Sequence, residues 1–95
     1  YLKYYDERIE EKFQSDQVDI VRDILKHTAR EEILTARGAR EIYKENKKTK
    51  VDEDELSSIL FELVHDYYLC TDRGTKQWRF AAKPIQDWWL KNKCF

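Results

Sequence analysis

Two aromatic-rich segments within residues 67–80 form the most informative part of the pattern of apolar and polar positions. They flank residues 72–76, which contain one glycine and no large apolar side chain. Trp78 and Phe80 lie two positions apart, so they would share one face of a strand. This pattern predicts a β-hairpin. Helices must cover its apolar face, because an isolated pair of strands is marginal in water.

A helix is predicted after the hairpin, beginning at Pro84, because proline is well tolerated in the first turn of a helix. Ile85, Trp88 and Trp89 follow at helical spacing. Neighbouring helical residues point about 100° apart, so the two tryptophans cannot both occupy the centre of one small core. Either one packs on the hairpin while the other is partly exposed to a partner, or both pack against different walls of the domain.

The first third of the chain predicts two helices, at residues 1–14 and 16–30. Their apolar stripes are Leu2, Tyr5, Ile9, Lys12 and Phe13 in the first helix, and Val18, Val21, Ile24 and Leu25 in the second. Ser15 and Asp16 are candidate N-caps for the second helix. Residues 31–34 either finish that helix or form the short extended piece that often precedes a helix-turn-helix.

Two more helices are predicted at residues 35–47 and 52–66. Thr35 is a candidate N-cap of the first, and Gly38 inside that helix weakens it by up to ~1 kcal/mol. Asp52, followed by a glutamate three residues later, has the spacing of a capping box for the second. The second helix also has the cleanest apolar stripe in the chain, formed by Leu56, Ile59, Leu60, Leu63 and Val64.

This order of elements predicts a mainly α fold with a β-hairpin, that is, a winged helix-turn-helix with added N-terminal and C-terminal helices. Helices 35–47 and 52–66 would form the helix-turn-helix, and the hairpin would be the wing. We expect one domain over residues 1–95. Residues 1–14 would lead in from a missing upstream domain, and residues 16–90 would form the winged-helix core with its C-terminal helix.

Composition changes this picture only slightly. The 95 residues are 39% charged and 41% apolar with a net charge of −1, which points to neither a nucleic-acid nor a membrane partner. Cys70 and Cys94 are too few for a disulfide framework, and no apolar run approaches the length of a membrane span, so we expect a cytoplasmic setting. The chain contains no Met and opens on a helical pattern, which predicts a fragment of a longer protein.

A winged helix suggests DNA binding, but the residue types of helix 52–66 argue against it. That helix carries Asp52, Glu53, Asp54, Glu55, Glu62 and Asp66, and it has no Lys or Arg. Base contacts are dominated by Arg, Lys, Asn and Gln, and approach to a duplex needs cations against its phosphates. The acids in the first turn also have a structural explanation, because they stabilise the helix dipole.

The basic residues lie elsewhere, in helix 35–47 with its following turn and in the hairpin. They are Arg37, Arg40, Lys44, Lys47, Lys48 and Lys50 in the first set, and Arg73, Lys76 and Arg79 in the second. The hairpin set could contact nucleic acid, with Trp78 nearby for stacking. We favour a solvated face or pairing with the acids of helix 52–66. A basic helix beside an acidic one also suits docking onto another protein. The candidate partner or nucleic-acid contacts are therefore Arg73, Lys76, Arg79, Trp88, Trp89, Arg40, Lys44, Lys47 and Lys48.

No catalytic, cofactor or metal site is predicted within these residues. His27, His65, Cys70 and Cys94 match no zinc-binding spacing. The sequence also lacks a Gly-rich phosphate loop, a G-x-S-x-G motif, and a Cys or Ser with a credible base partner. We therefore expect this chain not to be an enzyme.

The second half of the chain resembles a known family. The matching residues are Leu56, then Leu63-Val64-His65-Asp66-Tyr67-Tyr68-Leu69, then Trp78-Arg79-Phe80, then Pro84-Ile85-Gln86-Asp87-Trp88-Trp89. This pattern is similar to the C-terminal winged-helix region that follows the nucleotide-binding core in archaeal-type, STAND-like P-loop ATPases, which are related to AAA+ proteins. The resemblance covers residues 18–90 and is specific mainly from Leu60 onward.

The resemblance implies that an upstream part carries the Walker motifs and binds ATP and Mg²⁺, with no cofactor in this fragment. It also implies that this fragment packs on that core and relays its nucleotide state. In some relatives a histidine near the end of the second strand contacts the nucleotide phosphates. Ala81 and Ala82 follow Phe80 here, so that histidine is absent.

The main hypothesis is a non-catalytic winged-helix module of a larger cytoplasmic P-loop ATPase, acting in interdomain or protein–protein docking and regulation. Its partners would be the upstream ATPase domain of the same chain and other proteins. The alternative is the DNA-binding winged-helix domain of a transcription regulator, contacting DNA through the wing and helix 35–47.

Overall fold

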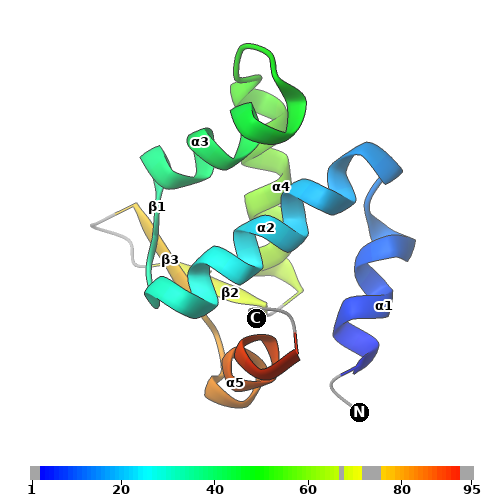
Figure 1. Cartoon of the computed structure of the whole chain (residues 1–95), viewed down its shortest axis with the longest axis vertical. Coiled ribbons are helices and arrows are strands. Elements are labelled where there is room, and N and C mark those ends of the chain that lie inside the picture. Colours follow the sequence, from blue (N-terminus) through cyan, green and yellow to red (C-terminus); the bar gives the residue numbers. More distant parts are fainter. Residues whose placement is uncertain (1–2, 67, 72–75, 93–95) are drawn as a thin grey trace.

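The computed structural model describes residues 3–66, 68–71 and 76–92. The fold is mainly helical with a small antiparallel sheet (Figure 1). In chain order its elements are α1 Lys3–Lys12, α2 Ser15–Glu31, β1 Leu34–Thr35, α3 Ala36–Lys47, α4 Glu53–His65, β2 Leu69–Thr71, β3 Gln77–Phe80 and α5 Lys83–Asn92. Each predicted helix is present to within a few residues at either end.

The sheet has the strand order β1-β3-β2, with β3 antiparallel to both neighbours. Leu34 of β1 pairs with Trp78, and Leu69 of β2 pairs with Phe80. The ambiguous segment after α2 therefore contains a short strand, and α2 itself ends at Glu31. The predicted hairpin is confirmed in β2 and β3, and β1 extends it to three strands.

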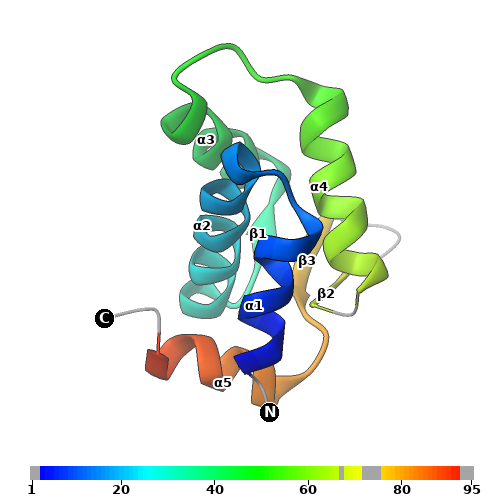
Figure 2. The same ribbon diagram turned by 90° about the vertical axis from the view of Figure 1, so that its right-hand side faces the viewer.

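Helix α2 lies at the centre and packs against α1, α3, α5 and two of the strands. It buries one apolar face consisting of Val18, Ile20, Val21, Ile24, Leu25 and Ala29. Figure 2 shows α2 and α3 on one side of the molecule and α4 on the other, with α5 at the end opposite the α3–α4 turn. Phe80, Ile85 and Trp89 bring the hairpin and α5 into the same core.

The helix starts show which cap predictions were right. Thr35 Oγ1 accepts a hydrogen bond from the Gly38 N–H at 3.1 Å, so the predicted cap of α3 is confirmed. The prediction for α2 was wrong, because Ser15 is already helical and Gln14 is the N-cap. The Gln14 N–H donates to Gln17 Oε1 at 3.2 Å, so the side chain at the third helical position bonds back to the N-cap, as in a capping box.

The cap of α4 is the strongest local start signal in the chain. Asp52 Oδ1 accepts hydrogen bonds from the backbone N–H groups of Asp54 at 3.1 Å and Glu55 at 3.2 Å. Two of the four unpaired donors of the first turn are therefore satisfied by one carboxylate.

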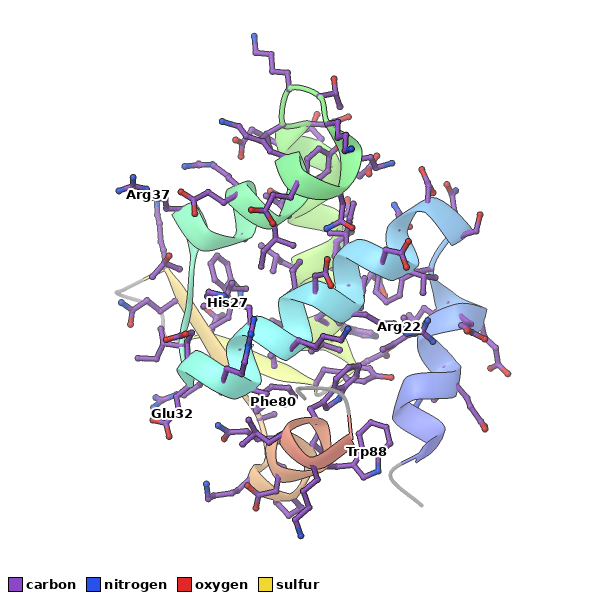
Figure 3. All side chains as sticks on the ribbon, viewed as in Figure 1. Arg22, His27, Glu32, Arg37, Phe80 and Trp88 are labelled. Carbon is purple, nitrogen blue, oxygen red and sulfur yellow. The ribbon has the colours of Figure 1, made fainter. Side chains whose placement is uncertain are left out.

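Helix α1 is held to the rest of the molecule by apolar burial and by ion pairs. Ile9 and Phe13 are buried in the core. Lys12, expected on the same apolar stripe, instead places its Nζ 2.6 Å from Asp66 Oδ2 and 3.2 Å from Glu62 Oε2 at the end of α4. Arg22 reaches from α2 toward α1, with its Nη2 3.0 Å from Glu10 Oε1 (Figure 3).

Replacing Asp52 by Ala should reduce the free energy of unfolding by about 1 kcal/mol, because two N–H groups at the start of α4 lose their acceptor. Asp52→Asn keeps a capping oxygen and should retain most of that stability. Asp54→Ala is the matched control, since it removes the same charge from the same turn without removing a cap. Urea unfolding followed by circular dichroism measures all three. An Asp54→Ala loss as large as that of Asp52→Ala would contradict the capping role.

Candidate functional site

The outer face of α4 and the hairpin frame a groove with a volume of about 340 Å³. Its lining residues come from the start of α3, from α4, and from the paired strands β2 and β3. They are Ala36, Arg40, Glu53, Leu56, Ser57, Leu60, Phe61, Val64, Thr71 and Trp78. Most of these side chains are apolar, so the groove can take an apolar group out of water.

The helical spacing of α4 produces both the floor and the rim of this groove. Leu56 and Leu60 belong to the buried stripe of the helix. Ser57 and Phe61 each follow one position later, so they lie on the neighbouring outer face. Small Ser57 leaves the groove open, while Phe61 projects beside it.

Phe61 is the most exposed large apolar side chain in the described part of the chain, with 67% of its surface accessible. Its ring stacks on His65 one turn later, with centroids 6.1 Å apart and an interplanar angle of 11°. The contact leaves most of the Phe61 ring exposed to water. An exposed aromatic beside an apolar groove is typical of a surface that binds another protein.

An ion pair closes the groove at the start of α4. Arg40 Nε donates to Glu53 Oε1 at 3.0 Å, and both side chains remain about half exposed. The predicted pairing between the basic helix and the acidic helix is therefore confirmed for Arg40. This ion pair engages the Arg40 guanidinium, which in a DNA-binding surface would contact a phosphate.

Lys47 makes the second connection from the basic helix. Its Nζ lies 2.6 Å from Asp16 Oδ2 and 3.4 Å from Glu55 Oε1, which joins the end of α3 to the start of α2 and the first turn of α4. The hydrogen bond from Lys47 is the main cause that lowers the pKa of Asp16 below its ordinary value. The same bond raises the pKa of Lys47, since the ammonium form is the one that Asp16 stabilises.

The remaining predicted cations are exposed. Lys44 and Lys48 lie near the end of α3, where Lys48 adopts a left-handed φ of 52° and donates its backbone N–H to Lys44 O. Lys76 precedes β3 with a φ of 50°, and Arg79 lies on the opposite face of β3 from Trp78. Arg73 lies outside the described residues.

The hairpin cations and the cations at the end of α3 do not form one surface. Because β1 leads directly into α3 and pairs with β3, the hairpin lies beside the beginning of α3. Residues 44–48 lie at the far end of that helix, next to the α3–α4 turn (Figure 1). A ligand that used the hairpin cations would therefore not reach the cations at the end of α3 without spanning the molecule.

The adjacent tryptophans have different environments. Trp89 is 0% exposed and belongs to the core, whereas Trp88 is half-buried on the side of α5 nearer α1 (Figure 3). Their rings meet edge to face, with centroids 5.6 Å apart. The expectation that Trp89 contacts a partner is therefore wrong, because core packing leaves none of its surface accessible. Trp88 remains a candidate contact.

Sequence reasoning missed Phe61 and the groove. The stripe of helix 52–66 was identified correctly, and Phe61 lies just outside it. A large aromatic residue outside an otherwise clean apolar stripe is a signal that could have drawn attention to this face. The groove itself depends on Trp78 and Ala36, which are distant in sequence.

Among the described residues, no group of three or more His, Cys, Asp or Glu side chains is arranged to hold a metal ion. Cys94 lies outside that part of the chain. No described helix combines the length and the apolar character needed to cross a membrane.

Comparison of the chain with known protein families, with curated proteins and with solved structures gives no match.

The Lys47 connection predicts a pH-dependent contribution to stability. The lowered pKa of Asp16 means that the contribution is present above that carboxyl's ordinary value of 3.8 and is lost as the pH falls through its folded-state value. The raised pKa of Lys47 means that it is present below 10.5 and is lost as the pH rises through the folded-state value.

Lys47→Gln should therefore lower the urea midpoint at neutral pH, and the deficit should shrink as the pH falls through the folded-state pKa of Asp16, because the protonated carboxyl no longer attracts the ammonium. Lys44→Gln is the matched control, because this neighbouring lysine has no ion pair among the described residues. A deficit that keeps the same size as the pH falls would show that Lys47 acts through packing rather than through its charge.

Proposed function

We propose that this chain is a winged-helix module that docks onto protein and does not itself catalyse a reaction. The order α2-β1-α3-α4-β2-β3 supports the winged-helix assignment. In this assignment α3 and α4 are the helix-turn-helix, β2 and β3 are the wing, and β1 joins the wing to the helices through its pairing with β3.

The observation that carries the docking function is the chemistry of the outer face of α4. In a DNA-binding winged helix this face would enter the major groove. Here its exposed side chains are Glu53, Asp54, Ser57, Ser58, Phe61 and His65. A carboxylate-rich first turn is repelled by phosphates, and an exposed phenylalanine beside an apolar groove gains most from burial against another protein.

The resemblance to STAND-like, AAA+ related ATPases adds a proposal about the parent protein. In this proposal the module packs beside a P-loop core that binds ATP and Mg²⁺, and it communicates the nucleotide state to partners. The coding sequence upstream of Tyr1 tests this directly, since a G-x-x-x-x-G-K-[ST] motif is expected there. An upstream sequence without that motif would remove the ATPase part of the proposal and leave the docking function standing.

DNA binding through the wing is the second candidate. Lys76 and Arg79 are exposed on the hairpin, and the Arg37 side chain is 90% exposed at the start of α3 (Figure 3). These cations lie on neighbouring elements, so a duplex could contact them together. This candidate uses backbone phosphate contacts and leaves α4 without a role in base recognition.

The two functions separate in a titration of a labelled duplex of about 20 base pairs at roughly 50 and 200 mM salt. Docking predicts weak binding that Lys76→Glu and Arg79→Glu do not change. Lys44→Glu is the matched control, because it makes the same charge change at the far end of α3. Tight binding that falls steeply with salt and is lost in the hairpin variants, but not in Lys44→Glu, would overturn docking in favour of the DNA-binding alternative.

A further inference from the structure

We propose that the groove between α4 and the hairpin binds a basic amphipathic helix of a partner protein. Apolar side chains of that helix enter the groove, and a Lys or Arg beside them faces the acidic first turn of α4. This inference rests on the proposed docking function and specifies the chemistry of the partner that the surface accepts.

The first argument is the shape of the groove. Along α4 its lining continues from Glu53 to Val64, which is about three helical turns or roughly 16 Å. The facing wall comes from Ala36, Thr71 and Trp78. An elongated slot of this kind suits the recognition mode in which an amphipathic helix lays its apolar face into an apolar groove.

The second argument is the apolar surface that the groove and its rim offer together. Leu56, Leu60 and Val64 line the α4 side of a volume of about 340 Å³, which admits a large apolar side chain. Phe61 stands on the rim, 67% exposed, and can pack against a second apolar side chain one turn further along the bound helix. The apolar stripe of an amphipathic helix supplies anchors at this spacing.

The third argument is the charge of α4, because residues 52–66 include carboxylates and no Lys or Arg. Among the described residues that line the groove, Arg40 is the one cation, and it is already paired with Glu53. Asp54 is exposed and has no ion pair within the described part of the chain. It lies about two helical turns before Phe61 on the same face. The charge left over beside the groove is therefore negative, and it favours a cationic partner.

The contact area and the exposure of the charges set the strength that we expect. Helix α4 has 13 residues, and the groove is confined to its outer face and the adjoining elements. Such an interface falls at the small end of specific protein contacts, so we expect a dissociation constant of about 10–100 µM. Salt should weaken the binding without abolishing it, since salt screens the exposed charges but not the apolar contact.

Two synthetic peptides of about 18 residues, long enough to form a helix, test the inference with the chain as it stands. Both carry leucine at the same helical spacing, and the remaining positions are lysine in one peptide and glutamate in the other. In a fluorescence anisotropy titration the leucine–lysine peptide should bind at least about tenfold more tightly than the leucine–glutamate peptide. NMR spectra of the complex should show shifts of the Trp78 indole and of the Leu60 and Val64 methyl groups.

Two variants, each with a matched control, separate the groove from unspecific attraction to an acidic surface. Phe61→Ser should weaken binding of the leucine–lysine peptide at least about fivefold, whereas Ile33→Ser should not, because Ile33 is 44% exposed but lies outside the groove. Asp54→Lys should weaken it about three- to tenfold at low salt, and the loss should shrink at about 1 M salt. Asp19→Lys makes the same charge change at an exposed position of α2 and should have little effect. Circular dichroism should show the same helix content in all four variants.

A wild-type chain that binds neither peptide, or that prefers the leucine–glutamate peptide, would overturn the inference. So would equal binding by Phe61→Ser and Ile33→Ser, which would place the peptide outside the groove, or by Asp54→Lys and Asp19→Lys, which would remove the reason for a cationic partner. None of these results would affect the docking function, which depends on the duplex titration. Tight, salt-dependent duplex binding that is lost in the hairpin variants would instead overturn docking, whichever peptide the chain binds.

Discussion

The pairing of β1 with β3 fixes the position of the remaining elements. It joins Leu34 to Trp78, across a large part of the chain, and the two residues of β1 run directly into α3. The hairpin follows α4, so this short ladder closes a loop that contains both helices. Closing such a loop costs conformational entropy, and burial of Leu34 against the central helix offsets that cost. Without this pairing, Trp78 and the start of α3 would not meet beside α4.

Ion pairs from α3 also hold α2, α3 and α4 together. Lys47 connects α3 to both α2 and α4, and Arg40 connects α3 to the first turn of α4. Each of these cations neutralises part of the acidic segment before Leu56. Glu53 and Glu55, two of the acids that argue against DNA binding, therefore also make contacts within the protein. The apolar face of α4 beyond them is left as its most distinctive surface.

Local features were predictable from sequence, and features that depend on distant neighbours were not. The caps at Thr35 and Asp52 were identified because a capping side chain bonds to backbone groups two or three residues away. The strand at Leu34 stayed ambiguous, because two residues become a strand only through a partner elsewhere in the chain. Gln14 occupies the N-cap position in place of the expected Ser15 or Asp16, and its N–H bonds to Gln17, a contact that the simple preference for short polar caps overlooks.

In the candidate site, too, some features could be predicted from the sequence and others depend on residues that are distant in the chain. Helical spacing established that adjacent Trp88 and Trp89 differ in environment, but only the packing of α5 against α2 shows that Trp89 is the buried one. The groove could not be foreseen, because its walls come from three separate parts of the sequence. Phe61 is different, because its position just outside the apolar stripe is visible in the sequence alone. The sequence alone places Phe61 outside the apolar stripe, but it does not show that Phe61 lies beside a groove.

Stability does not explain why Phe61 occupies that position. Phenylalanine has a lower helix propensity than glutamate, lysine or glutamine, any of which would suit an exposed position in the interior of α4. The contact with His65, with centroids 6.1 Å apart, does not compensate for leaving 67% of Phe61 exposed to water. The fold would therefore be at least as stable with a polar residue there. What Phe61 adds is apolar surface beside a groove that can accept such a surface, and this benefit is realised only when another molecule covers it.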